Sequence, residues 1–481
     1  MVMQGFYLIV PELILAIVSC VGIALGAFSK RHSDRFFAVF VCLFCVLSAS
    51  CYIFAGQEQY LWDGALVIDN LSVFAKSLIL LTSSIVLLVT WNFWQREKML
   101  SVEYPVLVGI SVLGMMFMVS AGNFLVLYLA MEIQAIPLYV LAAYGFRGKA
   151  SSEAAMKYFI FGALASGIFL YGVSLVYGMT GSLKFLDVSL AIGAMPEGGT
   201  PLLLVGVVCI IVGICLKLAL APFHMWAPDV YQGSSLPFVM FIATVPKIAG
   251  MIVFLRLMYD AFLFVSGQWI QVIAIIAAVS IVAGALAAVV QSNIRRLIAY
   301  SSVAHMGYAM LGFLAGTEEG VAAVIVYLII YTISAVGLFS LLLSVNKSGQ
   351  FFEKVSDFSG LSKRSPALAL GFAILLLSLA GIPPFFGFFA KLFVFRVALQ
   401  QGMLVLVLLA AVMAVIGAYY YLKIIKVMYF SEPTMLTGTE FSLTHRTVAM
   451  IACILLASAW LPFVNGFFIS DVAEWASFSL F

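Results

Sequence analysis

The chain has 481 residues, of which 64% are hydrophobic and only 9% are charged. Soluble domains carry about 25% charged residues, so most of this chain cannot form a water-exposed surface. The net charge of +3 is spread along the chain without a basic cluster, which excludes nucleic-acid binding. Alternating strands typical of a membrane barrel are absent. Because lipid cannot satisfy backbone N–H and C=O groups, long apolar stretches must be helices. The composition predicts an all-α polytopic membrane protein.

Fourteen apolar stretches follow one another along the chain, and each is expected to span the membrane. The first is expected to be retained, because no basic region or small-residue cleavage site precedes it. The predicted spans are 6–28, 36–55, 70–92, 105–120, 123–143, 154–178, 202–222, 237–258, 268–290, 297–315, 322–344, 367–396, 402–429 and 447–466.

The lysines and arginines between the spans predict how the chain is oriented. Of the 24 such residues, fourteen lie in odd-numbered loops, whereas the even-numbered loops and both tails hold only Lys184. The odd loops are therefore expected in the cytoplasm and both termini in the periplasm. Four more lie near helix ends, where long side chains can reach the interface: Arg256, Arg396, Lys423 and Lys426.

The longest connection on the basic side, 346–366, has a pattern of its own. Phe351, Phe352, Val355, Phe358 and Leu361 recur at helical spacing, with charged residues between them. This pattern favours an amphipathic helix at the membrane surface. A plain loop is the alternative.

Seven cysteines lie inside apolar stretches, and Cys42 and Cys45 have a CxxC spacing. A redox or metal site would need thiolates in a polar, accessible place with further ligands nearby. We interpret all seven as small hydrophobic side chains. No metal site is expected.

Six ionisable residues remain inside the predicted spans. A charge at the bilayer centre costs at least ~2.5–3.5 kcal/mol, so such residues mark ion paths, proton relays or structural ion pairs. Three of the stretches around Glu132, Lys217, Lys247 and Lys391 adjoin a proline, which opens the helix backbone. The six residues are Lys76, Glu132, Lys157, Lys217, Lys247 and Lys391.

Lysine suits proton transfer because burial destabilises its charged form, whereas a nearby carboxylate stabilises it. A Glu–Lys pair whose geometry changes can therefore load and release a proton, which arginine cannot do. A static ion pair is the alternative, but several lysines cannot all pair with one carboxylate. Lys76 lies near the start of its span, and we interpret it as structural, reaching outward. His305 is a relay or a packed polar group.

The spacing of these residues suggests an internal repeat. Glu132 precedes His305 by almost the same number of positions as Lys217 precedes Lys391. Spans four to eight would correspond to spans nine to thirteen, and a five-helix unit must invert when it is repeated. The expected division is 1–104 (three helices), 105–258 (first repeat), 259–430 (second repeat) and 431–481 (last helix and tail).

Two stretches resemble a known family: APFHMWAPDVYQGSSLP at 221–237 and QSNIRRLIAYSSVAHMGY at 291–308. Together with the buried charges and GIPP at 381–384, they are similar to the antiporter-like membrane subunits of proton-translocating NADH–quinone oxidoreductase, respiratory complex I. The likeness covers about residues 105–430. N-type subunits are the most similar, because L-type subunits carry a long C-terminal arm and M-type subunits have a glutamate at the place of Lys391.

This resemblance implies roles for the buried residues. Glu132 and Lys217 would be a switching pair, Lys157 and Lys247 central relays, and Lys391 the group on the exit side. His305 matches a polar position of span ten, and spans seven and twelve would be discontinuous. The loop residues His224, Trp226 and Asp229 are expected to shape the chain after the first break.

The resemblance also implies partners and a location. The chain itself has no haem, flavin or iron–sulfur motif, so NADH, FMN, iron–sulfur clusters and quinone are expected in partner subunits. Those partners would include the other antiporter-like subunits, in a bacterial inner membrane, with protons as the transported species. The alternatives are a subunit of a multi-subunit sodium/proton antiporter and a scaffold subunit without transport.

Overall fold

The computed structural model describes residues 2–28, 33–145, 148–195, 199–345, 352–433, 443–457 and 469–480. Nearly all of them are helical, as the composition predicts. The long helices are α1 (Val10–Phe28), α2 (Ser33–Cys51), α3 (Asn70–Arg96), α4 (Glu103–Val119), α5 (Phe124–Ala143), α6 (Lys149–Thr180), α8 (Pro201–Leu218), α10 (Leu236–Arg256), α11 (Ser266–Val289), α12 (Ile294–Phe313), α13 (Glu318–Val345), α15 (Pro366–Ala380), α16 (Phe386–Gln400), α17 (Leu404–Phe430) and α18 (Leu443–Ala457).

The remaining elements are short. The helical ones are η1 (Val2–Ile9), η3 (Tyr52–Phe54), α7 (Phe185–Gly193), α9 (Trp226–Gly233), η4 (Leu257–Ala261), η5 (Leu263–Val265), η6 (Val355–Phe358), α14 (Leu361–Arg364), α19 (Ile469–Ser477) and η8 (Phe478–Leu480). Strands β1 (Gln59–Leu61) and β2 (Leu66–Ile68) form an antiparallel hairpin in which Gln59 pairs with Ile68. The sequence patterns did not predict this hairpin.

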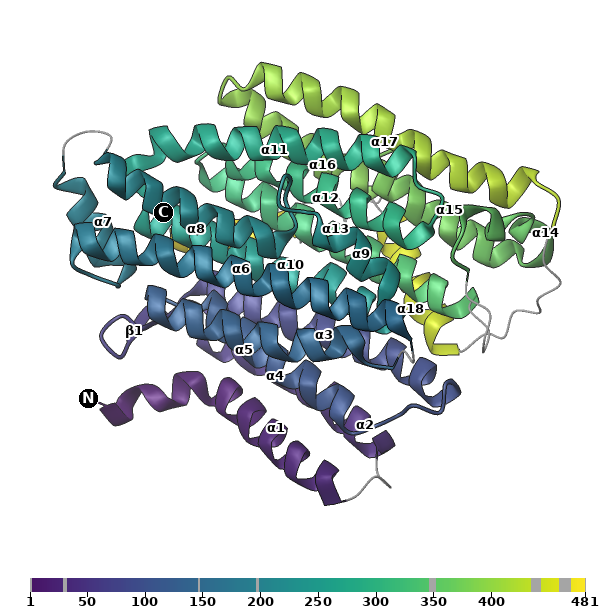
Figure 1. Cartoon of the computed structure of the whole chain (residues 1–481), viewed down its shortest axis with the longest axis horizontal. Helices are drawn as coiled ribbons and strands as arrows, with labels where there is room; N and C mark the ends of the chain where they lie inside the picture. Colours follow the sequence, from purple (N-terminus) through teal and green to yellow (C-terminus); the bar gives the residue numbers. More distant parts are fainter. Residues whose placement is uncertain are drawn as a thin grey trace.

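The long helices run side by side in one bundle, with α1 and α2 at one edge and α17 at the opposite edge (Figure 1). The apolar stretch that could cross a membrane is 94% buried in α10 and 89% buried in α13, whereas it is only 28% buried in α17. Polar side chains on α10 and α13 are therefore shielded from the surroundings of the protein by its outer helices.

Ten helices are long and apolar enough to cross a membrane, and three shorter apolar ones accompany them among the described residues. Every one of the fourteen predicted stretches contains a long helix or a broken pair, although the last lies partly outside those residues. Several helices begin with a side chain that accepts a backbone N–H, as Asp69 does for α3 and Asn123 does for α5. The number of membrane crossings stays a prediction.

Spans seven and twelve are each broken, as the resemblance implies. Helix α8 ends before Ala219 and α15 ends before Gly381, and both of these residues have left-handed backbone, with φ of 57° and 79°. Pro222 and Pro384 follow three residues later, each after a cis peptide bond. Proline removes a backbone donor and stops each first half. The chain resumes as α9 and α16, respectively.

Two kinds of local feature, an isolated strand-like bridge and a closely packed glycine, each occur twice, separated by the same number of residues. Asn123 pairs with Lys184 in an isolated bridge, and Asn293 pairs with Lys354 in the same way. At the same spacing, Gly114 packs against the backbone of α5 and Gly284 packs against that of α12. A shift by this spacing places Glu132 on Ser302, one turn before His305. This spacing and the sequence spacing thus pair Glu132 with different residues of α12, and the inverted repeat with its matched residues stays a prediction.

The predicted amphipathic helix in 346–366 is wrong for the residues that the structure describes there. Residues 346–351, and with them Phe351, lie outside those residues. Between 352 and 365 the chain forms only the 3₁₀ turn η6 and the single turn α14. Asp357 accepts the backbone N–H groups of Glu353 and Lys354, so this side chain starts a turn and competes with a continuous helix.

Candidate functional site

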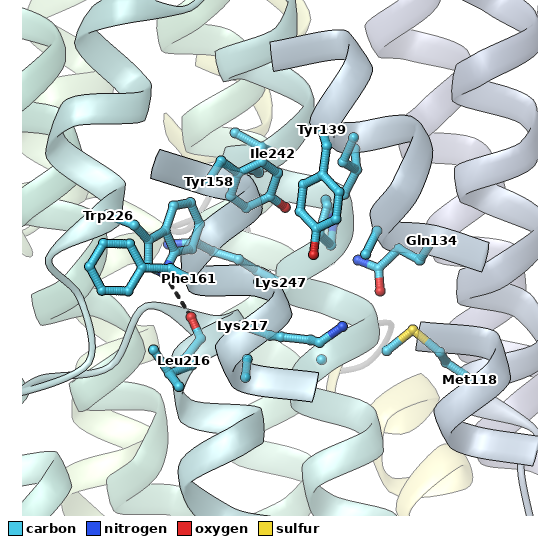
Figure 2. A pocket seen from close by; sticks show the side chains of 16 residues that line it. Met118, Gln134, Tyr139, Tyr158, Phe161, Leu216, Lys217, Trp226, Ile242 and Lys247 are labelled. Atoms are coloured by element: carbon cyan, nitrogen blue, oxygen red, sulfur yellow. Dashed lines mark hydrogen bonds between the residues drawn. The ribbon is translucent and has the colours of Figure 1, made fainter. Parts of the chain in front are cut away.

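Lys217 lies in the last turn of α8, beside the first break. Its side chain extends toward Gln134 and Met118 at one side of a pocket of about 40 Å³ (Figure 2). The buried Oε1 of Gln134 has no hydrogen-bond partner among the described residues. A water molecule needs about 10–15 Å³ and two or more polar partners. This pocket therefore has both the volume and the polar groups to hold water beside the Lys217 ammonium.

The expected pair of Glu132 and Lys217 is open in this conformation. Glu132 accepts a hydrogen bond from Ser166 of α6, while Lys217 Nζ lies 3.5 Å from the carbonyl oxygen of Met131. The described residues thus show no ion pair between the two side chains, although they lie on helices that face the same region. The structure shows one geometry in which the carboxylate is satisfied by a hydroxyl and the ammonium faces the pocket.

Lys247 lines the same pocket as Lys217, from the buried helix α10. Its side chain is 4% exposed, and its ammonium donates to the hydroxyl of Ser302 on α12. The Ser302 hydroxyl is in turn 2.8 Å from the Tyr331 hydroxyl, which donates to the Ala243 carbonyl. Since Ser302 accepts from Lys247 and Tyr331 donates onward, Ser302 donates to Tyr331. Three helices thus contribute one directed chain of donors and acceptors.

His305 lies one turn after Ser302 on α12, and it is 5% exposed. Its Nδ1 is 2.7 Å from the hydroxyl of Tyr327, and its Nε2 is 3.2 Å from the hydroxyl of Tyr421. One ring nitrogen of a neutral histidine donates and the other accepts, so the ring can pass a proton between two hydroxyls. His305 also lines a small cavity of about 10 Å³ together with Tyr331.

Lys391 lies on α16 beyond that cavity and is 7% exposed. Its ammonium donates to the carbonyl oxygens of Leu379 and Ala380 at 3.1 and 2.8 Å, at the C-terminal end of α15. These carbonyls have no helical partner, and the C-terminal end of a helix carries partial negative charge. The ammonium also lies 5.1 Å from the centre of the Tyr308 ring. At the second break, the lysine is therefore bound by the carbonyl groups at the C-terminal end of α15.

Lys157, expected to be a central relay, is not in this line of residues. Its ammonium lies 2.7 Å from Asp229 and 2.8 Å from Glu153, and its side chain is 38% exposed. Asp229 also binds Arg296 at 2.7 Å, around an open cavity of about 350 Å³. The neighbouring residue Tyr158, rather than Lys157, faces the pocket of Lys217 and Lys247.

Two predictions about where charged side chains reach are wrong. Lys76 does not reach outward, because it is 4% exposed and lies 2.6 Å from Glu12 of α1. Arg256 does not reach the interface either, because both of its contacts to the Asp69 carboxylate are 2.8 Å long and it is 2% exposed. Outside the spans, Lys184 donates to Asp63, and this hydrogen bond raises the pKa of Lys184.

The loop after the first break has the structural contacts expected of it. Trp226 donates its indole N–H to the carbonyl oxygen of Leu216 at 2.7 Å, as the dashed line in Figure 2 shows. Earlier in the same segment, between α8 and α9, Ala221 donates its N–H to Ser280 of α11 at 2.8 Å. The described residues contain no group of three His, Cys, Asp or Glu side chains that could hold a metal ion. Cys42 and Cys45 are exposed and not oxidised to a disulfide.

Sequence reasoning missed the hydroxyl groups that connect the ionisable residues. These are Ser166, Ser302, Tyr327, Tyr331 and Tyr421. A usable signal was nevertheless present, because Ser302 and His305 are three residues apart and Tyr327 and Tyr331 are four apart. Residues at these spacings share one face of a helix.

The fold and the buried line of residues define a class, the polytopic helical membrane proteins with broken helices and internal ionisable groups. Residues 121–417 match the family described as NADH:quinone oxidoreductase/Mrp antiporter, TM. The chain belongs to this family.

Three relatives illustrate the match. The chain is 41% identical to the NADH-quinone oxidoreductase subunit N of Rhodospirillum rubrum over 93% of each chain. It is similar to a chain in the structure of respiratory complex I from Thermus thermophilus with bound aureothin, with 32% identity, a TM-score of 0.80 and coverage of 93% and 96%. A chain of the Mrp complex from Dietzia has the same fold, with 21% identity, a TM-score of 0.85 and coverage of 98% and 97%.

Proposed function

We propose that the chain is the N-type membrane subunit of a proton-translocating NADH–quinone oxidoreductase. Its relatives of about 41% identity carry that name over most of their length, which supports the proposal. The observation that carries the transport role is the line of buried groups from Lys217 through Lys247 and His305 to Lys391. Several ionisable side chains in a bundle interior are costly to bury, and a row of them across the bundle serves ion movement.

The groups on this line divide into those that carry charge and those that connect them. Lys217, Lys247 and Lys391 hold the proton, and the hydroxyls of Ser302 and Tyr331 pass it from α10 toward α13. A hydroxyl both donates and accepts, so it can transmit a proton without holding a charge. Water in the pocket of about 40 Å³ would join Lys217 to Lys247.

The energy for transport reaches this chain as a change in the electrostatic interaction between neighbouring charged groups. Moving one proton against 100 mV costs about 2.3 kcal/mol. Two unit charges 4 Å apart interact by about 4 kcal/mol at an effective dielectric constant near 20. If the open Glu132–Lys217 pair closes to about 4 Å, its interaction is therefore large enough to offset the cost of moving one proton. NADH, FMN, iron–sulfur clusters and quinone belong to partner subunits. The termini would lie in the periplasm, and the division at 104, 258 and 430 stays a prediction.

The test is NADH-driven proton pumping in inverted membrane vesicles from cells that carry Lys217→Ala. We expect the ratio of pumped protons to transferred electrons to fall, because the residue beside the pocket no longer binds a proton. Lys184→Ala is the control, since that lysine is bound to Asp63 outside the spans. An unchanged ratio for Lys217→Ala in a fully assembled complex would contradict the proposed transport path.

Lys157→Ala tests the one family role that the geometry does not favour. We expect little change in the pumping ratio, because Lys157 bonds to Asp229 and Glu153 away from the pocket. A loss as large as that of Lys217→Ala would instead place Lys157 in the relay.

A sodium/proton antiporter subunit is the second candidate, and the fold shared with the Mrp complex chain is the observation that favours it. The two functions differ in their driving force. Sodium-driven proton movement in vesicles without NADH would favour the antiporter, and proton movement that requires NADH would favour the oxidoreductase.

A further inference from the structure

A groove between α15 and α18 lies outside the line of buried groups. Its cavity is about 430 Å³, and its walls are mostly apolar, with two arginines among them. Arg364 is the last residue of α14, two residues before α15 begins at Pro366, and Arg446 lies in the first turn of α18. Both ends lie on the side that the distribution of lysine and arginine predicts to be cytoplasmic.

The two arginines are the charged residues that line this groove. Among the described residues, neither guanidinium has a carboxylate partner, whereas the neighbouring Lys363 is paired with Glu432 at 2.8 Å. The N-terminal ends of α15 and α18 add partial positive charge at the same place. Two guanidinium groups with five N–H donors each suit a phosphate group.

The rest of the groove is suited to a hydrocarbon chain. Leu370 on α15 and Met450 and Ile454 on α18 line it and are 56%, 48% and 66% exposed. Met450 and Ile454 are four residues apart on one helix face, so the apolar wall continues away from Arg446 along the helix axis. The groove is therefore cationic at one end and apolar along its length.

We propose that this groove binds an anionic phospholipid of the cytoplasmic leaflet, with its phosphate between Arg364 and Arg446 and an acyl chain along α15 and α18. Basic pockets between helices on the cytoplasmic side recognise such headgroups. The inference does not depend on proton transport. It concerns a lateral face of the molecule, and none of its residues contributes to the pocket of Lys217.

The test uses the intact complex in nanodiscs with a phosphatidylglycerol that carries a photoreactive diazirine in its acyl chain. We expect crosslinks on α15 and α18, near Leu370, Met450 or Ile454, and much weaker labelling by the matching phosphatidylcholine. Each arginine near an anionic headgroup is worth about fivefold in affinity, so Arg364→Gln combined with Arg446→Gln should weaken labelling by about 25-fold.

Three further variants make the result specific. The double change of both arginines to lysine keeps the charge and should retain most labelling. Arg396→Gln is the matched control, because this exposed arginine of α16 does not line the groove. Met450→Trp fills the apolar wall without altering charge, and it should lower labelling as well. A purified complex with normal subunit content in each variant excludes a folding defect.

Several outcomes would overturn the proposal. Equal labelling by the phosphatidylcholine probe, or labelling independent of both arginines, would reduce the groove to an ordinary lipid-facing surface. Loss of labelling on adding millimolar inorganic phosphate at constant ionic strength would identify a free anion as the ligand. Crosslinks from α18 to another subunit in place of lipid would show that a protein partner fills the groove.

Discussion

The two broken helices have the same backbone construction but bind their lysines from opposite sides. Each first half ends at a left-handed residue, Ala219 or Gly381, with a proline three residues later. Lys217 belongs to the half before its break, whereas Lys391 belongs to the half after its break. When the two prolines are aligned, Lys391 corresponds to Asp229 and not to Lys217. The sequence spacing that pairs Lys217 with Lys391 therefore does not reflect equivalent places in the fold.

The carbonyl groups at the two breaks show how the placement of each lysine determines its contacts. At the first break the neutral indole of Trp226 satisfies Leu216, so the Lys217 ammonium is free to face the pocket. At the second break Lys391 itself satisfies the carbonyls of Leu379 and Ala380. A lysine that caps a helix end satisfies carbonyls that would otherwise be unpaired, so moving Lys391 away from α15 costs hydrogen bonds. We therefore expect the Lys217 ammonium to change its partners more readily than the Lys391 ammonium.

The largest difference between the breaks should appear on adding a methyl group. A Cβ on Gly387 would lie 1.8 Å from the Ser378 carbonyl oxygen, so Gly387→Ala must push α16 away from α15. Overpacking costs about 1–3 kcal/mol and occasionally more, and we expect a loss of assembled complex, measured by native electrophoresis. The corresponding residue at the first break is Met225, which is 65% exposed. Normal assembly of Gly387→Ala, or an equal loss for Met225→Ala, would contradict this reading.

Arginine substitutions separate charge from proton release at the two sites. Arginine stays protonated, so Lys217→Arg and Lys391→Arg keep the charge but cannot release it. We expect both variants to transfer electrons and to pump fewer protons per electron, with Lys217→Arg as low as Lys217→Ala. The assay is proton uptake by inverted vesicles at matched NADH oxidation. If Lys391→Arg pumps normally, Lys391 is only a structural cap for α15.

Removing the indole donor should make the first break resemble the second. Trp226→Phe removes the shorter of the two hydrogen bonds to the Leu216 carbonyl, which keeps only the Ala219 N–H at 3.3 Å, and a lost hydrogen bond costs about 0.5–1.5 kcal/mol. The ammonium of Lys217, the next residue, is a donor that can turn toward this carbonyl and away from the pocket. We therefore expect a lower thermal midpoint together with a partial loss of pumping. A stability loss without any change in the pumping ratio would show that Lys217 does not depend on Trp226.

How far the sequence predicts this site depends on what each residue costs to bury. Lys217, Lys247 and Lys391 stand out because a charge in an apolar stretch needs a reason. Tyr331 and Tyr327 do not stand out, because tyrosine is counted as hydrophobic and its hydroxyl partner lies on another helix. The partner of Lys76 was missed likewise, since Glu12 is far away in sequence.

The position of Lys157 outside the buried line has a different cause, the length of a helix. Helix α6 has 32 residues, more than the ~20 that span a bilayer, so its position along the membrane normal cannot be read from hydropathy. Lys157 lies near its first turns, with Glu153 four residues earlier on the same face. That pairing of opposite charges is typical of a solvated helix end and was a usable signal.

The smallest expected effects come from substituting Ala219 and Gly381, the residues at which α8 and α15 end. Left-handed backbone costs a non-glycine residue about 1–2 kcal/mol, and glycine loses about 0.5–1 kcal/mol in chain entropy. Ala219→Gly should therefore change the free energy of unfolding by about 1.5 kcal/mol or less. Gly381→Ala imposes the backbone cost and places a Cβ 2.8 Å from Cδ of Lys391, so it should also weaken the contact of Lys391 with the α15 carbonyls. We expect a modest fall in thermal stability and in pumping for Gly381→Ala alone. Equal, near-zero effects of both exchanges would mean that Lys391 can leave the end of α15 without cost, and the contrast between a movable Lys217 and a tightly held Lys391 would not hold.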